Sequence, residues 1–292
     1  MARRTGAIRN ILVATDLQAD SRAGVEMAGA IAAAAGARVH LFHVLEDAAD
    51  ARGSARAALL EQRAADARRA LDVQAQTLKD AGVRVGSVAR AKGGPAHRKI
   101  LARLERTEAD LVVLGSHSRE GPGRRLGSTA DRVLRTSPVP CLVVRGESRS
   151  AFRRVAALVD FSRVSRNTLR LAVDWLPVFP GAGQQPALEI VHVGDGQLRA
   201  LDPTVEGLLA SQLERERETA RKRAEGARLS TRLLWGRHPA AEVMAAAADG
   251  AYDLIVVGTH GRGPLVRALI GSVALALAQS APCPVLVVPP GS

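Results

Sequence analysis

The chain contains one internal repeat, and this repeat restricts the possible folds more than any other feature. Four residues that mark turns or loop ends recur at a constant offset of 144 positions: Asp16 as Asp160, Pro95 as Pro239, Gly127 as Gly271, and Pro138 as Pro282. A constant offset indicates that one structural unit has been duplicated. We therefore expect two tandem domains of one fold, at residues 1–147 and 148–292, with the polar stretch Gly146–Arg153 as the linker.

Each half alternates short apolar runs with longer Ala-rich and Leu-rich stretches. The short runs are typical of buried strands, and the longer ones carry apolar residues at helical spacing. Aromatic residues make up only 2% of the chain, so the interior must consist of Ala, Val, Leu and Ile, as in parallel strands covered by helices. The predicted fold class is α/β, with two tandem doubly wound, Rossmann-like domains that each contain a five-stranded parallel sheet. The expected strands are residues 9–15, 38–44, 83–89, 109–114 and 139–145, then 154–159, 187–193, 229–235, 254–257 and 285–288.

Three features of each half lie at the ends of expected strands. An Asp follows the first strand, a His-Val pair ends the second, and a glycine-rich loop follows the fourth. Ligands of doubly wound sheets bind beyond the carboxyl ends of the strands, so the three features can share one crevice. They begin at Asp16, Val44 and Gly115 in the first half, and at Asp160, Val193 and Gly258 in the second.

The glycine loop of the second half runs from Gly258 through Gly261 to Gly271 and Ser272, between a buried strand and a helix start. Glycines let the backbone approach a ligand closely, and the amides of a helix start can point at phosphate oxygens. Taken alone, the loop is equally well explained as an ordinary turn. Its presence at a duplicated strand end favours a phosphate site.

The glycine loop of the first half, which ends at Gly127 and Ser128, departs from this pattern. Ser118 stands where the second glycine belongs, and the loop is one residue shorter than its counterpart. A Cβ at this position would crowd a phosphate unless the loop is reshaped. The first half is therefore expected to bind more weakly or to keep only a structural loop.

Taken together, these motifs resemble the universal stress protein family over essentially the whole chain. The second half carries the complete family signature Gly-x2-Gly-x9-Gly-Ser. The resemblance implies a fold of the adenine nucleotide alpha-hydrolase type, ATP as the ligand with Mg²⁺ as a candidate companion, and an intrachain pseudo-dimer paired through the last strands. It also implies that Asp160 faces the ribose and that the backbone of Val193 reads the adenine. The phosphates would contact Gly258, Thr259, His260, Gly261, Gly271, Ser272 and Val273, and the first-half equivalents are Asp16, Val44, Gly115, Gly127 and Ser128.

Two side-chain roles stay open at this point. Asp160 can face a ligand or can simply turn the chain into the next helix, and Ser162 is an equally good cap for that helix. His117 and His260 occupy matching loop positions, but a general base needs a partner that the sequence does not show, so structural roles are expected. His43 and His192 are expected to be packed ring donors.

The chain is strongly basic, with 41 basic and 29 acidic residues, a net charge of +12 and a pI of about 11.1. Between residues 214 and 225, however, arginines alternate with glutamates at helical spacing, which is typical of a solvated helix face. The low aromatic content also removes the stacking platforms of single-strand binders. We therefore expect no specific nucleic-acid partner.

Other classes of protein are excluded by what the sequence lacks. Cys141 and Cys283 are too few for a disulfide framework or a metal cluster, so buried free thiols are expected. No apolar segment suits a signal peptide or a membrane span, so we expect a cytoplasmic protein with no membrane partner.

The sequence thus predicts a cytoplasmic, ATP-binding regulatory protein of the stress response, with a protein partner or a further homodimer as additional candidates. One alternative is a slow ATP hydrolase, for which Asp160 and His260 are the candidate groups. A second alternative is a nucleotide-independent interaction module.

Overall fold

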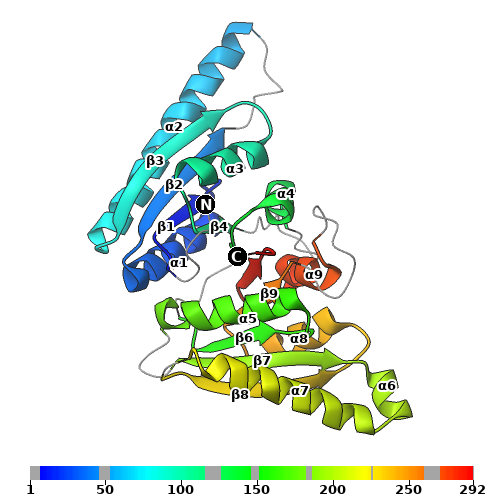
Figure 1. Ribbon diagram of the computed structural model, residues 1–292. Helices are drawn as coiled ribbons and strands as arrows, with labels where there is room; N and C mark the ends of the chain where they lie inside the picture. The colour runs from blue at the N-terminus through cyan, green and yellow to red at the C-terminus, as the bar shows by residue number, and fades with distance from the viewer. Residues whose placement is uncertain are drawn as a thin grey trace.

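The computed structural model describes residues 7–45, 53–115, 126–145, 151–181, 186–224, 226–259 and 270–291. Strands and helices alternate through both halves, as the repeat predicts (Figure 1). The first half contains β1 (Asn10–Ala14), α1 (Ala19–Ala35), β2 (Arg38–Leu45), α2 (Gly53–Asp80), β3 (Arg84–Lys92), α3 (Ala96–Arg106), β4 (Leu111–Gly115), α4 (Ser128–Thr136) and β5 (Cys141–Val144). The second half contains β6 (Arg154–Leu158), α5 (Arg163–Trp175), the short 3-10 helix η1 (Leu176–Val178), β7 (Ala187–Gly194), α6 (Gly196–Leu201), α7 (Thr204–Arg221), β8 (Arg228–Trp235), α8 (Pro239–Ala248), β9 (Leu254–Gly258), α9 (Ser272–Ser280) and β10 (Val285–Val288).

The strands of both halves form one ten-stranded sheet in the order β3-β2-β1-β4-β5-β10-β9-β6-β7-β8. Neighbours within each half run parallel, and the halves meet where β5 and β10 pair antiparallel, with Leu142 opposite Leu286. This confirms the expected intrachain pair through the last strands. The strand order reverses between β1 and β4 in the first half and between β6 and β9 in the second, which is where α/β sheets bind ligands.

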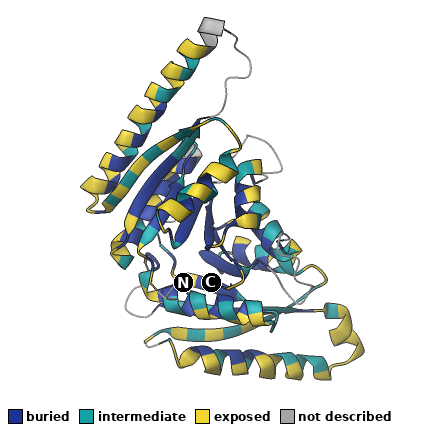
Figure 2. Cartoon of the chain, turned by 45° about the horizontal axis from the view of Figure 1, so that its top comes forward, coloured by how far each residue is buried: buried dark blue, intermediate teal, exposed yellow. Residues whose placement is uncertain are grey.

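Helices cover both faces of this sheet. On each face, one apolar core lies between the helices and the sheet and extends through both halves. One core contains side chains from α1, α2, α5 and α7, including Ile31, Leu71 and Val173. The other contains side chains from α3, α4, α8 and α9, including Leu104 and Leu277. The central strands are accordingly buried on both faces, whereas the edge strands β3 and β8 and the outer sides of the helices are partly exposed (Figure 2). Each buried branched side chain contributes about 1.5–3 kcal/mol to folding.

Glycine and proline mark the ends of several helices. Gly36 follows α1 with φ of 63°, a left-handed conformation that favours glycine, and its N–H donates to the carbonyl of Ala32. Pro239 occupies the first turn of α8, and Pro95 is the residue before α3. At the first helical position proline loses no hydrogen bond, because the amide there has no partner within the helix.

The junction between the halves differs from the expected polar linker. Residues 146–150, which include the expected domain boundary, lie outside the described residues. Phe152 lies within the predicted linker, yet it is 1% exposed and packs edge-to-face on Phe179 with ring centroids 5.8 Å apart. The linker prediction is therefore wrong at this end, because one aromatic side chain anchors the chain to the core.

The solvated helix face predicted near residue 214 is wrong at one position. Glu216 on α7 is buried, and its carboxylate accepts a hydrogen bond of 2.7 Å from Nε of Arg166 on α5. Arg217 and Glu214 form the expected ion pair along the helix surface. An ion pair between helices cannot be recognised from spacing along one helix.

Cys141 and Cys283 are both buried, and neither is part of a disulfide. Among the helices described, none combines the length and the apolar character that a membrane span requires.

Candidate functional site

A cavity of about 550 Å³ opens at the carboxyl ends of the strands in the first half. Asp16, Val44 and Gly115 all line it, so the structure brings together the three predicted strand-end features of this half. The cavity lies where the strand order reverses, and its volume falls within the range of small-molecule sites.

Helices supply the remaining walls of the cavity, a contribution that was not predicted from the sequence. Arg63, Ala67 and Ala70 of α2 line it, together with Ile100 of α3 and Thr129 of α4. The three α2 residues are spaced four and three positions apart and therefore share one helix face. This spacing was visible in the sequence, but only the fold shows that the face covers the strand ends.

The turn after the first strand is built in the same way in both halves. Oδ1 of Asp16 accepts the backbone N–H of Gln18 at 3.0 Å, and Oδ1 of Asp160 accepts that of Ser162 at 3.0 Å. The residues between them, Leu17 and Phe161, have φ angles of 67° and 64°. This conformation costs a residue with a side chain roughly 1–3 kcal/mol and is concentrated at functional sites.

The helix cap in the second half belongs to Ser162 rather than to Asp160. Oγ of Ser162 accepts the backbone N–H of Ser165 at 3.2 Å at the start of α5. Asp160 shapes the turn that precedes the cap, so the alternative of a purely structural turn residue has a geometric basis. The carboxylate is nevertheless held at the strand end, where the crevice is expected.

The two strand-end histidines tie neighbouring strands together. Nδ1 of His43 lies 2.9 Å from the carbonyl oxygen of Thr15, and Nδ1 of His192 lies 2.8 Å from that of Val159. A carbonyl only accepts, so Nδ1 carries the proton and donates, as expected for packed ring donors. Each bond holds the His-Val strand end beside the turn that carries the Asp.

The helices that follow the glycine loops, α4 and α9, both start directly after a glycine. Gly127 has φ −59° and ψ 148°, and Gly271 has φ −60° and ψ 147°. These angles are open to every residue type, so the conformation itself does not require glycine. Neither helix has a side-chain cap, and the amides of a first helical turn have no carbonyl partner within the helix.

The first turns of these two helices differ in charge. The first turn of α4 contains Asp131, whose carboxylate pairs with Arg135 at 2.9 Å, whereas α9 has no acidic residue there and carries Leu275 at the matching position. A carboxylate beside the amino end of a helix opposes the binding of an anion there. The amino end of α9 lacks the carboxylate that α4 carries in its first turn.

The ends of the second glycine loop are joined to each other. The backbone N–H of Gly271 donates to the carbonyl of Thr259, and that of Thr259 donates to the carbonyl of Val288 at 2.9 Å. These bonds place Gly258 and Thr259 at the end of β9 beside the start of α9 with Ser272 and Val273. His260 and Gly261, and Ser118 in the first half, lie outside the described residues.

Gly115 has a packing role that the sequence analysis did not recognise. A Cβ at this position would come within 3.3 Å of Cα of Ser21 at the start of α1. The end of β4 therefore packs directly against the α1 backbone. A side chain at this strand end would require the α1 backbone to move by a few tenths of an ångström, so packing favours glycine here whether or not a ligand approaches it.

The second half has an aromatic group near Val193 that the sequence analysis also missed. Trp235, at the end of β8, lies beside Gly194, where an added Cβ would come within 2.6 Å of the indole ring. The guanidinium of Arg199 stacks over this ring at 4.9 Å from its centroid. Lys92 occupies the matching position in the first half, where it pairs with Leu45 as Trp235 pairs with Gly194, so the two strand-end regions differ in shape.

Within the described part of the chain, no group of three or more His, Cys, Asp or Glu side chains is placed to hold a metal ion.

Comparisons with known proteins agree on one family. The family model described as "Universal stress protein family" matches residues 7–145 and 151–289. A universal stress protein of Mycolicibacterium smegmatis is 31% identical over 306 residues, which cover 96% of this chain and 97% of the relative. One from Mycobacterium tuberculosis is 28% identical over 199 residues, or 62% of each chain. The crystal structure of a universal stress protein from Archaeoglobus fulgidus superposes with a TM-score of 0.71 at 21% identity, covering 96% of this chain and 98% of that one.

Proposed function

Because the chain belongs to the universal stress protein family and contains two tandem domains of it, we propose that it binds ATP in its strand-end crevices. Binding is assigned chiefly to the second domain, residues 148–292, while the first, residues 1–147, carries the altered glycine loop. The cellular role that follows is regulatory: a cytoplasmic protein of the stress response whose nucleotide-bound state is read by a protein partner.

One observation carries this proposal, namely the glycine that precedes both α4 and α9. Because the angles of Gly127 and Gly271 are accessible to any residue, the missing side chain points to a need for space. The amides of the following helical turn are directed at that space, and the helix dipole favours an anion there. The phosphates of a nucleotide meet both conditions.

In the second half each strand-end feature has a proposed role toward ATP. Asp160 faces the ribose, and the backbone of Val193 contacts the adenine. The backbone amides of Ser272 and Val273 donate to phosphate oxygens, with Gly258, Thr259, His260, Gly261 and Gly271 lining the approach. Asp16, Val44, Gly115, Gly127 and Ser128 are the equivalent groups of the first half.

Magnesium fits this arrangement as a companion of the nucleotide. Mg²⁺ is usually held by one or two carboxylates together with phosphate oxygens, which does not require a protein cluster of three ligands. Asp160 is the carboxylate that we assign to it in the second half. Its orientation is fixed by the hydrogen bond from the Ser162 amide.

The preference for the second half rests on charge and on the loop sequence. The first turn of α9 lacks the carboxylate that Asp131 places in the first turn of α4. Gly261 stands where the first half has Ser118. If each charge-assisted hydrogen bond contributes about 1.5–3 kcal/mol, three or four suffice for micromolar affinity, near −8 kcal/mol.

Calorimetric titration of Mg-ATP into the wild type and two matched variants tests the proposal. In Gly271→Val the side chain fills the phosphate space, and we expect ATP affinity to fall about 100-fold, which corresponds to roughly 3 kcal/mol. Gly127→Val makes the same change at the matching position of the first half and should leave the tighter site intact. Equal ATP affinity in the wild type and in both variants would show that the site is misplaced.

Product analysis after prolonged incubation with Mg-ATP separates a binding protein from a slow hydrolase. Turnover that disappears in Asp160→Ala would establish an enzyme. Binding without turnover would support the regulatory assignment, and failure of ATP to bind at all would favour a nucleotide-independent interaction module.

A further inference from the structure

A second cavity, of about 590 Å³, lies at the amino ends of β2 and β3. The strand-end crevice described above lies at the carboxyl ends of the strands. Its charged lining residues are Arg38, at the start of β2, Lys79, in the last turn of α2, and Arg84, at the start of β3. His40, Gly82, Val83, Val85 and Gly86 complete the described lining, which contains no carboxylate. We call this the basic pocket.

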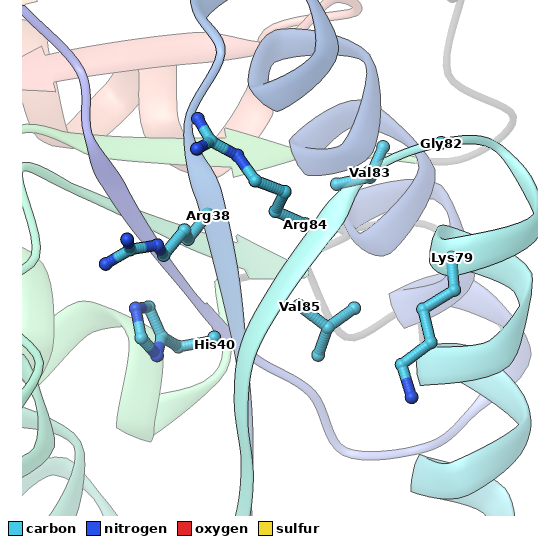
Figure 3. A pocket seen from close by; sticks show the side chains of 8 residues that line it. Arg38, His40, Lys79, Gly82, Val83, Arg84 and Val85 are labelled. Atoms are coloured by element: carbon cyan, nitrogen blue, oxygen red, sulfur yellow. The ribbon is translucent and has the colours of Figure 1, made fainter.

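The three cations come from different elements around the amino ends of β2 and β3. Figure 3 shows Arg38 and His40 projecting from β2 to one side, Lys79 coming from α2 on the other side, and Arg84 reaching toward the amino end of β2. Long side chains placed around an opening can turn toward a shared anion, since each retains several rotatable bonds.

Two of these cations lie on neighbouring strands. Arg38 and Arg84 are partners in the parallel register of β2 and β3, and adjacent strands lie only about 4.8 Å apart. Like charges directly opposite each other destabilise a sheet. Arg84 donates to the carbonyl of Gly36, but among the described residues neither arginine nor Lys79 pairs with a carboxylate.

The acidic groups near the pocket are engaged with other partners. Asp110, at the start of β4, accepts the backbone N–H groups of Arg9 and Asn10 at 2.8 and 3.0 Å. Asp80, next to Lys79, accepts a hydrogen bond from Gln76 at 2.7 Å. Within the described ranges, these contacts leave the cations of the pocket without a carboxylate partner.

The positive charge near the pocket also affects the pKa of His40. Its pKa is lowered, first by burial and then by the charges of Arg103 and Arg38. The charge of Arg38 therefore affects the pKa of His40, a residue that lines the pocket.

The duplicated second half provides an internal comparison, because the fold is the same there and the charges differ. Ala187 stands opposite Arg228 where the first half has Arg38 opposite Arg84. Arg223, which is 144 positions after Lys79, is paired with Asp174 at 2.8 Å. The fold therefore does not need an unneutralised cluster of cations at this edge.

We propose that the basic pocket binds a compact multivalent anion of the phosphate class, such as pyrophosphate or the phosphoryl groups of a small metabolite. Guanidinium groups bind phosphate oxygens in a bidentate manner, and an ammonium adds a point charge. A bound anion would also offset the repulsion between Arg38 and Arg84. This site is separate from the strand-end crevices and does not depend on the function proposed for them.

Calorimetric titration of pyrophosphate into the full chain tests the assignment with a matched pair of variants. Arg38→Ala removes one exposed pocket cation and should weaken pyrophosphate binding at least tenfold. Arg228→Ala removes the same charge from the equivalent edge of the second half and should change it less than twofold. Lys79→Gln, at an exposed helix position, should weaken binding in the same direction as Arg38→Ala.

Two further measurements show whether pyrophosphate binds at the basic pocket. Pyrophosphate should shift the ring resonances of His40 in NMR spectra of the wild type and not in those of Arg38→Ala. ATP affinity should be the same in Arg38→Ala and the wild type, which separates this pocket from the glycine loops. Equal losses in Arg38→Ala and Arg228→Ala would indicate general attraction of anions to a basic protein, and no loss in either would also overturn the proposal.

Discussion

At the scale of single residues, His40 forms the centre of a hydrogen-bonded chain under α3. Arg103 donates to Oγ of Ser87, and that oxygen lies 2.8 Å from Nδ1 of His40. Nε2 of His40 lies 3.3 Å from Oδ1 of Asn10, which only accepts. The ring must therefore carry its proton on Nε2 and accept from the Ser87 hydroxyl at Nδ1. A second proton on the ring would break this chain, in keeping with the lowered pKa that burial and two arginines give His40.

This arrangement predicts a loss of stability in mild acid. Below a pH of about 6.5 the unfolded chain takes up a proton at position 40 while the folded chain resists it, so unfolding becomes more favourable until the pH reaches the lowered pKa. We expect the melting temperature to fall less between pH 7 and pH 5.5 in His40→Gln than in the wild type. Thermal unfolding followed by circular dichroism measures this, with His238→Gln at an exposed position as the control; equal falls in all three proteins would contradict the assignment.

The ring of His40 leaves no room for a side chain at Gly86 on the neighbouring strand. The register of β2 and β3 shifts between Val39 and His40, which leaves Gly86 as the extra residue of a bulge. A Cβ there would lie 2.4 Å from Cε1 of the His40 ring. Gly86→Ala should therefore destabilise the protein by about 1–3 kcal/mol through overpacking.

Urea unfolding measures this effect against a second glycine in an open position. An added Cβ at Gly207 on α7 meets no atom within 4 Å, and Gly207→Ala should stabilise the protein by about 0.5–1 kcal/mol. If both alanine variants changed stability by the same amount and sign, the close approach of His40 would not matter.

At the scale of elements, each half uses one carboxylate to join the starts of two neighbouring strands. Asp253 precedes β9 and accepts from the backbone N–H of Arg154 at 3.1 Å, with the Arg154 guanidinium also bound to it. Asp110 precedes β4 and accepts two backbone N–H groups in the same manner. Both carboxylates bind the amino ends of the first strand of their half, so the duplication preserved the contact while the surrounding sequence changed.

The carboxylate of the second half is expected to matter more for stability. Asp253 is 5% exposed and binds a charged partner, whereas Asp110 is half-buried and binds backbone amides only. Asp253→Ala should cost about 2–3 kcal/mol because it removes a buried carboxylate that accepts hydrogen bonds from both the backbone and the guanidinium of Arg154. Asp110→Ala, the matched variant, should lower the free energy of unfolding by less. Chemical denaturation measures both losses. A larger loss in Asp110→Ala than in Asp253→Ala would contradict this assignment and would indicate that solvent replaces the hydrogen bonds of Asp253.

At the scale of the whole molecule, the two halves are held together by β5 and β10. All four residues of each strand are buried. Arg145, at the end of β5, also donates to the carbonyl of Ala278 at the end of α9, with a distance of 2.6 Å. The amino end of α9 lies at the second glycine loop, so this helix connects the proposed phosphate site to the first half.

Removal of the first half should expose β10 as an unpaired edge. A fragment containing residues 148–292 is expected to form a homodimer, because β10 can pair antiparallel with its own copy and cover the same apolar side chains. Sedimentation of this fragment in the ultracentrifuge measures its mass directly. A stable monomer would show that other contacts, not strand pairing, hold the halves together.

The sequence by itself determined the duplication, the α/β class and the order of the strand-end features. The α/β class depends on local spacing, because the period of the apolar residues and the positions of glycine and proline can be read from neighbouring residues. The duplication is visible as a constant offset of 144 positions between matching residues. The alternation of strands and helices and the positions of Gly36 and Pro239 followed from the same local chemistry.

Only the tertiary structure decided which distant side chains meet. It placed Arg63 of α2 over the strand ends, brought Glu216 to Arg166, and anchored Phe152 in the core. It also showed that Gly271 has angles any residue could adopt. Long-range packing sets these relations, since each depends on segments whose separation along the chain says nothing of their distance in the fold.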